Sequence, residues 1–189
     1  DYTFASSANG LTVTVTDTKT GDADTVTGVE TLRFAGGVDI GVSRDSTDGH
    51  MILTGTDAAD SITIVGNVGI EVPGTDGADI LTGGAGDDDI EGAVGKDTIA
   101  GGAGDDTLDG GANDDILSGD AGSDTIDGGD GADIAKFAGK QADYTFASSS
   151  DGKTITVTHV ATSDADTVTN VETLSFDDGD IGVSLDTNG

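Results

Sequence analysis

The sequence predicts an all-β protein: a right-handed parallel β-roll flanked by two copies of a small antiparallel β module. Three observations support this prediction. A nine-residue repeat rich in glycine and aspartate runs from Gly74 to Lys136, and a segment near the start of the chain recurs close to its end. Among the 37 acidic residues only four are glutamates, a bias toward the short carboxylate that suits tight turns. High charge with few aromatic residues is also typical of disorder, but the strict periodicity favours an ordered repeat fold.

The longer repeat sets the boundaries that we expect for the chain. Residues 1–43 recur at 143–184 with about 30 identical positions. This pattern indicates a tandem array with a period of about 140 residues. We expect a flanking module at 1–49, degenerate repeats at 50–73, the roll at 74–136 and the second module at 137–189.

The flanking module shows the period-two alternation of β-strands, as in Leu11, Val13 and Val15. We expect the second copy to seal the open end of the roll, because solenoids need caps. The side chains expected to be buried in this cap are Phe137, Tyr144 and Phe146.

Two irregular copies precede the regular repeats. Residues 55–62 resemble an opening copy that carries Asp60, and 66–73 resemble a shortened copy with Glu71 at the acidic position. We therefore expect the repeat pattern to begin before Gly74.

Seven regular nonapeptides then follow one another without interruption. Glycine occupies the first position of each, and the fourth position of all but one, where Asn113 also tolerates a left-handed backbone. The sixth position holds Asp79, Asp88, Asp97, Asp106, Asp115, Asp124 and Asp133. The eighth position holds Leu81, Ile90, Ile99, Leu108, Leu117, Ile126 and Ala135.

Each nonapeptide predicts a glycine turn followed by a very short strand, with the eighth side chain pointing inward. Two nonapeptides make one 18-residue coil, so alternate strands lie on opposite walls. One wall is neutral and presents Ile80, Ile116 and Ile134, whereas the other is acidic. We expect the neutral wall to be covered by a flanking module or by another copy of the chain, although isoleucine also simply favours strands.

Composition excludes several classes of partner. A net charge of −30 opposes binding to nucleic acid and anionic membranes, and no apolar run approaches the roughly 18 residues of a membrane span. The absence of Cys removes disulfides and thiolate chemistry. We therefore expect no nucleic acid partner and no membrane insertion.

Enzyme signatures are also missing. HExxH, GxSxG and a glycine loop followed by Lys-Ser/Thr do not occur, so we expect no catalytic activity. Aspartate pairs such as Asp87 and Asp88 imitate a glycosidase pair, but their recurrence along the repeats favours ion binding. We interpret His50 and His159 as ordinary surface residues, because Asp17 stands where His159 would fall in the first module.

The regular repeats need a cation. Residues 74–136 carry a formal charge of −15, from sixteen Asp and Glu91 against two Lys. One inward apolar residue in nine is also a small core for so much ordered glycine backbone. Carboxylates and carbonyls are hard oxygen ligands, and flexible turns of this kind favour Ca²⁺ over Mg²⁺, Zn²⁺ or Cu²⁺.

The repeats GGAGDDDIE and GGAGDDTLD resemble the hemolysin-type, or repeats-in-toxin (RTX), calcium-binding nonapeptide family. The resemblance implies roughly five to eight Ca²⁺ ions, each lying between turns of repeats i and i+2. It implies carboxylate ligands from the sixth-position aspartates named above and from Asp60. It also implies carbonyl ligands near the first and third positions, namely Gly83, Ala85, Gly92, Val94, Gly101 and Ala103.

Three functional classes are compatible with these features. The first is a calcium-folded structural module of a secreted or cell-surface tandem-repeat protein such as an adhesin, surface layer or fibre. The near-verbatim repetition is compatible with self-association between copies of the chain. The resemblance to the family implies folding after type I export. The second is an RTX secretion and folding tail of an extracellular hydrolase or toxin, and the third is a carbohydrate-binding surface on the flanking sheets.

Overall fold

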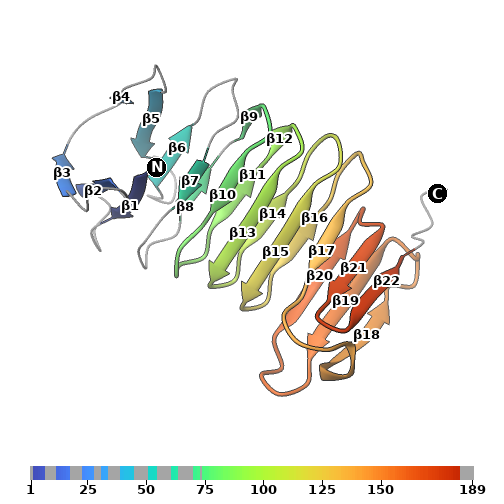
Figure 1. The fold of residues 1–189 in the computed structure, drawn as a ribbon. Helices are drawn as coiled ribbons and strands as arrows, with labels where there is room; N and C mark the ends of the chain where they lie inside the picture. Colours follow the sequence, from blue (N-terminus) through green and yellow to red (C-terminus); the bar gives the residue numbers. More distant parts are fainter. Residues whose placement is uncertain are drawn as a thin grey trace.

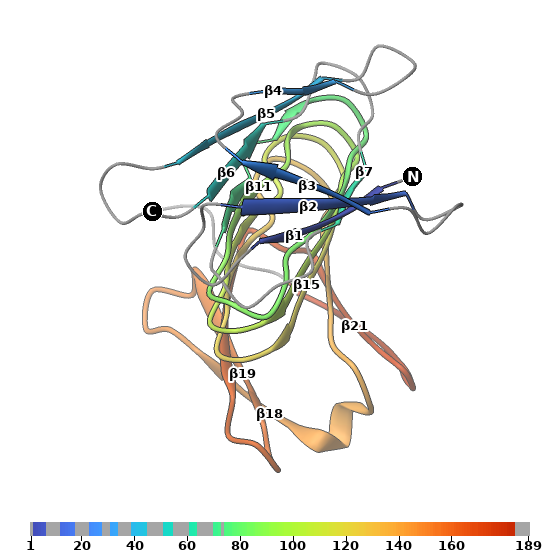
Figure 2. The ribbon, with the colours of Figure 1, turned by 90° about the vertical axis from the view of Figure 1, so that its left-hand side faces the viewer.

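The computed structural model describes residues 74–183 and, before them, only the strands between Tyr2 and Val72. Side chains are described for Val72 and for 74–183 except Thr75. The predicted fold class is confirmed: the described residues form a parallel β-roll whose short strands lie side by side along one axis (Figure 1). Seen along that axis, the coils superimpose as stacked ovals (Figure 2).

Alternate strands fall on two opposite walls, as the nonapeptide spacing predicts. The first wall is a seven-stranded sheet in the order β22-β21-β17-β15-β13-β10-β7. The second is a ten-stranded sheet in the order β18-β19-β20-β16-β14-β11-β8-β6-β5-β4. Within the roll, Ile80 pairs with Thr98 and Asp89 with Thr107, in each case 18 residues along the chain.

The strands of the roll are short. The first wall contains β7 (Ser61–Thr63), β10 (Ile80–Thr82), β13 (Thr98–Ala103), β15 (Ile116–Ala121) and β17 (Ile134–Lys136). The second contains β6 (Met51–Thr54), β8 (Ile70–Val72), β11 (Asp89–Glu91), β14 (Thr107–Asp109) and β16 (Thr125–Asp127). A two-stranded pair, β9 (Thr75–Asp76) and β12 (Ala93–Val94), lies at one turn edge.

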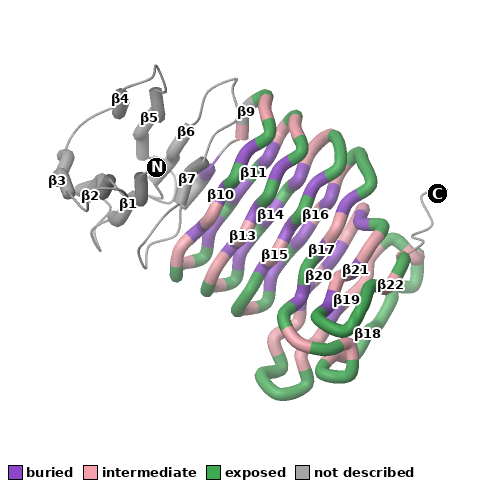
Figure 3. Tube along the Cα trace, in the orientation of Figure 1, coloured by how far each residue is buried: buried purple, intermediate pink, exposed green. Residues whose placement is uncertain are grey.

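The core is a double stack of eighth-position side chains between the walls. All seven predicted inward residues are buried, and the purple stripe in Figure 3 follows them from strand to strand. One stack runs through Leu81, Ile99, Leu117, Ala135 and Leu174, and the other through Val72, Ile90, Leu108, Ile126 and Val168. Each residue packs on its equivalent in the next coil, so one apolar position per nonapeptide is enough to fill the interior.

The second flanking module does more than cover the end of the roll. It contains a 3₁₀ turn at Gln141–Asp143, then β18 (Tyr144–Ser148), β19 (Thr154–His159), β20 (Ala165–Thr169), β21 (Thr173–Phe176) and β22 (Gly179–Gly182). The predicted antiparallel pairs are present, in β18-β19-β20 and in β21-β22. However, β20 and β21 also pair in parallel with β16 and β17, so the module supplies one more coil of the roll.

The aromatic cluster of this module differs in part from the prediction. Phe137 is buried and stacks on Phe176 at a ring-centroid distance of 5.4 Å, and Tyr144 is half-buried beside both rings. The predicted burial of Phe146 is wrong, because this side chain is 42% exposed on β18, an outer strand of the sheet. His159 lies at the end of β19, which confirms its prediction as a strand residue, and it packs on Tyr144, whereas His50 lies outside the described residues.

The first flanking module is described by its strands alone: β1 (Tyr2–Ser6), β2 (Thr12–Asp17), β3 (Ala23–Thr27), β4 (Thr31–Arg33) and β5 (Asp39–Arg44). Strands β1, β2 and β3 form an antiparallel sheet. Strands β4 and β5 pair with each other, and β5 pairs with β6, which joins the second wall next to β8.

The irregular copies also join the roll. Ile62 lies opposite Leu81, which is the register expected of an opening copy, but Asp60 lies outside the described residues. The expectation for Glu71 is wrong: it pairs with Asp89 at the seventh position, and Val72 takes the buried eighth position. The shortened copy keeps its apolar residue in register because that side chain fills the core.

Two of the three isoleucines on the neutral wall are exposed among the described residues. Ile80 is 52% exposed and Ile116 is 37% exposed, so the expectation that a flanking module covers them is wrong, whereas Ile134 is partly buried. Cover by another copy of the chain stays a prediction. In the second flanking module, β20 and β21 extend the two walls edge to edge, whereas β1, β2 and β3 of the first module form a separate sheet.

Candidate metal centre

The sixth-position aspartates line the two turn edges of the roll. Asp79, Asp97, Asp115 and Asp133 stack along one edge, and Asp88, Asp106 and Asp124 along the other. All seven are at most 3% exposed. Burial of so many carboxylates is rare unless each has a compensating partner.

In five of these aspartates one carboxylate oxygen accepts a hydrogen bond from the preceding coil. Asp79 donates its main-chain N–H to Asp97 Oδ1 at 2.7 Å, and the same bond joins Asp97 to Asp115 and Asp115 to Asp133 at 2.8 Å. On the other edge Asp88 donates to Asp106 at 2.8 Å, and Asp106 donates to Asp124 at 2.9 Å. The sixth position therefore requires a short acidic side chain that reaches back exactly one coil, which explains why it does not vary.

The second oxygen of five of these carboxylates has no partner. The Oδ2 atoms of Asp97, Asp106, Asp115, Asp124 and Asp133 are buried without a hydrogen bond. In the second regular nonapeptide, by contrast, Asp88 Oδ2 accepts the Gly84 main-chain N–H at 2.7 Å. A buried anionic oxygen without a donor is strongly unfavourable, so these five positions call for a cation.

First-position carbonyls face these oxygens. A Cβ placed on Gly92 would lie 2.5 Å from the Gly110 carbonyl oxygen and 2.6 Å from Asp97 Oδ2. A Cβ on Gly83 would likewise meet the Gly101 carbonyl oxygen and Asp88 Oδ2. The first-position glycine thus leaves a space lined by oxygen atoms from two successive coils.

The third-position residues occupy a different place. Ala85, Val94 and Ala103 have exposed side chains on the outside of the turns. The Val94 carbonyl oxygen accepts the Gly77 N–H at 2.8 Å, so it belongs to the hydrogen bonds that stack one turn on the next. The structure therefore brings the aspartates together with the first-position carbonyls, and it directs the Val94 carbonyl toward the neighbouring coil.

The electrostatics of the two edges follow from this burial. Desolvation raises the pKa of Asp106 and Asp115 to about 7 and that of Asp133 to about 6. The main-chain N–H of the preceding coil lowers each value in part, and the charges of neighbouring carboxylates raise it again. Without a cation the edges consequently resist full ionisation near neutral pH.

Two acidic residues of the flanking module continue the ladders, and the sequence analysis missed both. Asp124 donates its N–H to Asp166 Oδ1 at 2.9 Å, and Asp133 donates its N–H to Glu172 Oε2 at 2.8 Å. The signal was present, because Asp166-Thr167-Val168 and Glu172-Thr173-Leu174 match the acidic, strand and inward positions of a nonapeptide. The missing glycine turn before them hid the resemblance.

The residues present fit Ca²⁺. Among the described residues no group of three or more His, Asp or Glu side chains converges on one point. The oxygen atoms that lie together at the two edges are carboxylate and main-chain carbonyl oxygens. Hard oxygen ligands of both kinds are the usual ligands of Ca²⁺, whose flexible coordination tolerates turns of unequal shape.

The described residues contain no helix that is long and apolar enough to cross a bilayer.

Part of the chain matches a known family of repeats. The family model of the RTX calcium-binding nonapeptide repeat (4 copies) matches residues 73–108 and 100–135. No curated protein matches the chain. Among solved structures, the extracellular lipase LipA from Serratia marcescens is similar over 57% of this chain and 14% of that one, with 24% identity and a TM-score of 0.36. Residues 73–135 are therefore RTX calcium-binding nonapeptide repeats, carried by a chain that folds as a parallel β-roll.

Proposed function

We propose that this segment is a calcium-folded structural module of a secreted or cell-surface tandem-repeat protein. In this proposal roughly five to eight Ca²⁺ ions bind between successive turns on both edges of the roll. The aspartates and first-position carbonyls hold the ions, and the flanking modules join one roll to the next. The segment itself catalyses no reaction.

The observation that carries the proposal is the set of five buried Oδ2 atoms without a hydrogen-bond partner, distributed over the two turn edges of the roll. A bound cation lowers the free-energy cost of burying these oxygen atoms. An ion that binds only the folded chain stabilises it by RT ln(1+[L]/Kd) per site. Extracellular calcium modules bind with a Kd of about 10⁻⁴–10⁻³ M. The module is thus expected to be unfolded at cytosolic calcium levels, which suits export through a type I channel, and to fold outside the cell.

The tandem assignment rests on a second observation, the near-verbatim repetition of the flanking module. Residues 1–43 and 143–184 share about 30 positions, among them the acidic residues Asp166 and Glu172, which correspond to Asp24 and Glu30. In the second copy these residues continue the ladders of the roll. A repeated module whose acidic residues accept hydrogen bonds from a roll is suited to joining successive rolls into an array. Such an array is also suited to self-association with other copies of the chain.

Circular dichroism tests the calcium part of the proposal. The far-ultraviolet spectrum is recorded with about 5 mM Ca²⁺ and with excess chelator, and β content is expected only with calcium. Equal β content in both samples would reject calcium-dependent folding.

Reading the full parent sequence tests the structural role. Several successive units of about 140 residues support the tandem array. A single roll joined to a hydrolase or toxin domain contradicts it and favours the secretion and folding tail instead.

A further inference from the structure

We propose that the junction between the roll and the second flanking module is itself a calcium site, formed by Asp133, the Asn170 main-chain carbonyl and Glu172. This inference rests on the proposed function and deepens it, because it assigns a metal ligand to the flanking module. It follows from the position of the module in the coil register, from a buried oxygen without a partner, and from the length of one side chain.

The register makes 169–172 the counterpart of a nonapeptide turn. In the roll, Gly92 donates its N–H to the Asp109 carbonyl at 2.7 Å, and Gly110 donates to that of Asp127 at 2.8 Å. Gly128 continues the series by donating to the Thr169 carbonyl at 3.0 Å. Thr169 and Asn170 therefore take the places that Asp127 and Gly128 hold one coil earlier.

The Asn170 carbonyl consequently takes the place of a first-position carbonyl. A Cβ on Gly110 would lie 2.6 Å from the Gly128 oxygen and 2.7 Å from Asp115 Oδ2. A Cβ on Gly128 would meet the Asn170 oxygen and lie 2.9 Å from Asp133 Oδ2. The oxygen-lined space of the roll is thus repeated at its boundary with the module.

Asp133 Oδ2 supplies the independent indication of a ligand. Asp133 is fully buried, and this oxygen has no hydrogen-bond partner, whereas its Oδ1 accepts the Asp115 N–H. Asp133 therefore resembles the aspartates inside the roll: it is buried, one carboxylate oxygen accepts a main-chain N–H, and the other has no partner. A cation is required here for the same reason as in the coils before it.

Glu172 compensates for a shortened turn. Five positions separate Gly128 from Asp133, but only two separate Asn170 from Glu172, and Asn170 adopts a left-handed φ of 49°. The extra methylene of glutamate lets Oε2 reach the Asp133 N–H at 2.8 Å, the same bond that an aspartate makes elsewhere. This explains why a glutamate, rare in this chain, stands at the acidic position.

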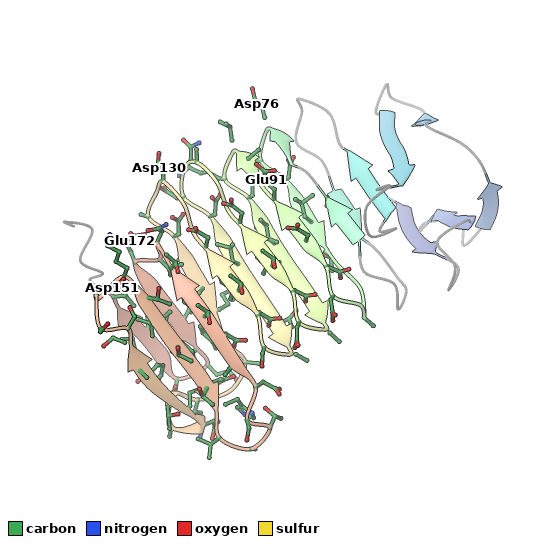
Figure 4. The ribbon with its side chains drawn as sticks, turned by 180° about the vertical axis from the view of Figure 1, so that it is seen from behind. Asp76, Glu91, Asp130, Asp151 and Glu172 are labelled. Carbon is green, nitrogen blue, oxygen red and sulfur yellow. The ribbon has the colours of Figure 1, made fainter. Side chains whose placement is uncertain are left out.

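The site is also open to ions from solvent. Glu172 is exposed, and a hollow of about 450 Å³ beside it is lined by Asp127, Asp130, Asn170 and further residues of this edge. Figure 4 shows Asp130 and Glu172 along the same margin of the molecule. Additional carboxylates at this hollow attract divalent cations toward the junction.

The test compares Glu172→Gln with Asp180→Asn in the whole chain. Both changes remove one exposed carboxylate from the same module, but Asp180 lies on β22, away from the turn. Bound Ca²⁺ is counted by equilibrium dialysis and elemental analysis. Calcium-dependent protection of β21 and β22 is followed by hydrogen exchange.

Glu172→Gln is expected to bind one Ca²⁺ fewer and to lose calcium-dependent protection at 170–183, while 74–108 stays protected. Asp180→Asn is expected to match the unmodified chain. Asn170→Gly keeps the carbonyl and tolerates the left-handed φ, so it is expected to retain the ion.

An unchanged ion count and unchanged protection in Glu172→Gln would overturn the junction site while leaving the proposed function intact. No bound calcium in the unmodified chain would overturn the proposed function and this inference together.

Discussion

Gly92 provides a sharp test of how the roll holds its ions. A methyl group added in Gly92→Ala would lie 2.5 Å from the Gly110 carbonyl oxygen and 2.6 Å from Asp97 Oδ2, closer than carbon and oxygen approach without displacement. The methyl group would therefore occupy the oxygen-lined space between two coils. We expect this variant to lose one ion and to keep its fold in the remaining coils.

The size of the effect follows from linkage. One site with a Kd of about 10⁻⁴ M contributes about 2.7 kcal/mol when calcium is about 100 times the Kd. For a chain of this length that loss lowers the melting temperature by about 5–10 °C. The matched control is Gly182→Ala, because a Cβ at Gly182 meets no atom within 4 Å.

The assay is thermal unfolding followed by circular dichroism at about 10 mM Ca²⁺, together with an ion count for both variants. Gly92→Ala is expected to melt earlier than Gly182→Ala and to bind one ion fewer. If Gly92→Ala bound as many ions as the control, the first-position glycine would not form part of an ion site.

Three further predictions concern backbone strain, acidity and the core. Ala93 adopts a left-handed φ of 70°, so Ala93→Gly is expected to raise the free energy of unfolding by about 1 kcal/mol in denaturant titrations. Ala103→Gly, without that strain, is expected to lower it, and the opposite order would contradict the strain. Because folded pKa values of Asp106 and Asp115 near 7 exceed the ordinary 3.8, the ion-free fold has its full proton-linked stability below about pH 4 and loses it as the pH rises toward about 7. Far-ultraviolet circular dichroism in chelator should therefore show more β content at about pH 4.5 than at about pH 8, and a rise of β content with pH would refute this. Leu108 is fully buried in the inward stack, so Leu108→Ala is expected to cost about 2–5 kcal/mol in calcium-loaded denaturant titrations, while Thr107→Ala on the exposed side of the same strand changes little.

The regular part of the fold could be predicted because each position of the nonapeptide has one physical task. Leu81 and its equivalents must fill the core, and Asp97 and its equivalents must reach one coil back, so the period alone gives the strands, the walls and the carboxylate ladders.

The boundaries were harder to predict because there the same tasks are met by different residues. Glu172 replaces an aspartate after a shortened turn, and Asp166 follows an antiparallel hairpin, so neither lies at the expected spacing. Glu71 was misplaced because the shortened copy keeps its apolar residue, Val72, in register at the expense of its acidic position. Phe146 lies on an outer strand, and its sequence alternation alone does not show which side of that strand is covered.

Counting bound calcium in the folded chain tests the central claim most directly. Elemental analysis of the dialysed protein, paired with a crystal structure grown in calcium, gives both the number of ions and their ligands. The proposed arrangement predicts ions at the Oδ2 atoms of Asp97, Asp106, Asp115, Asp124 and Asp133, each with a main-chain carbonyl beside it. A folded chain without calcium at these five atoms would contradict it.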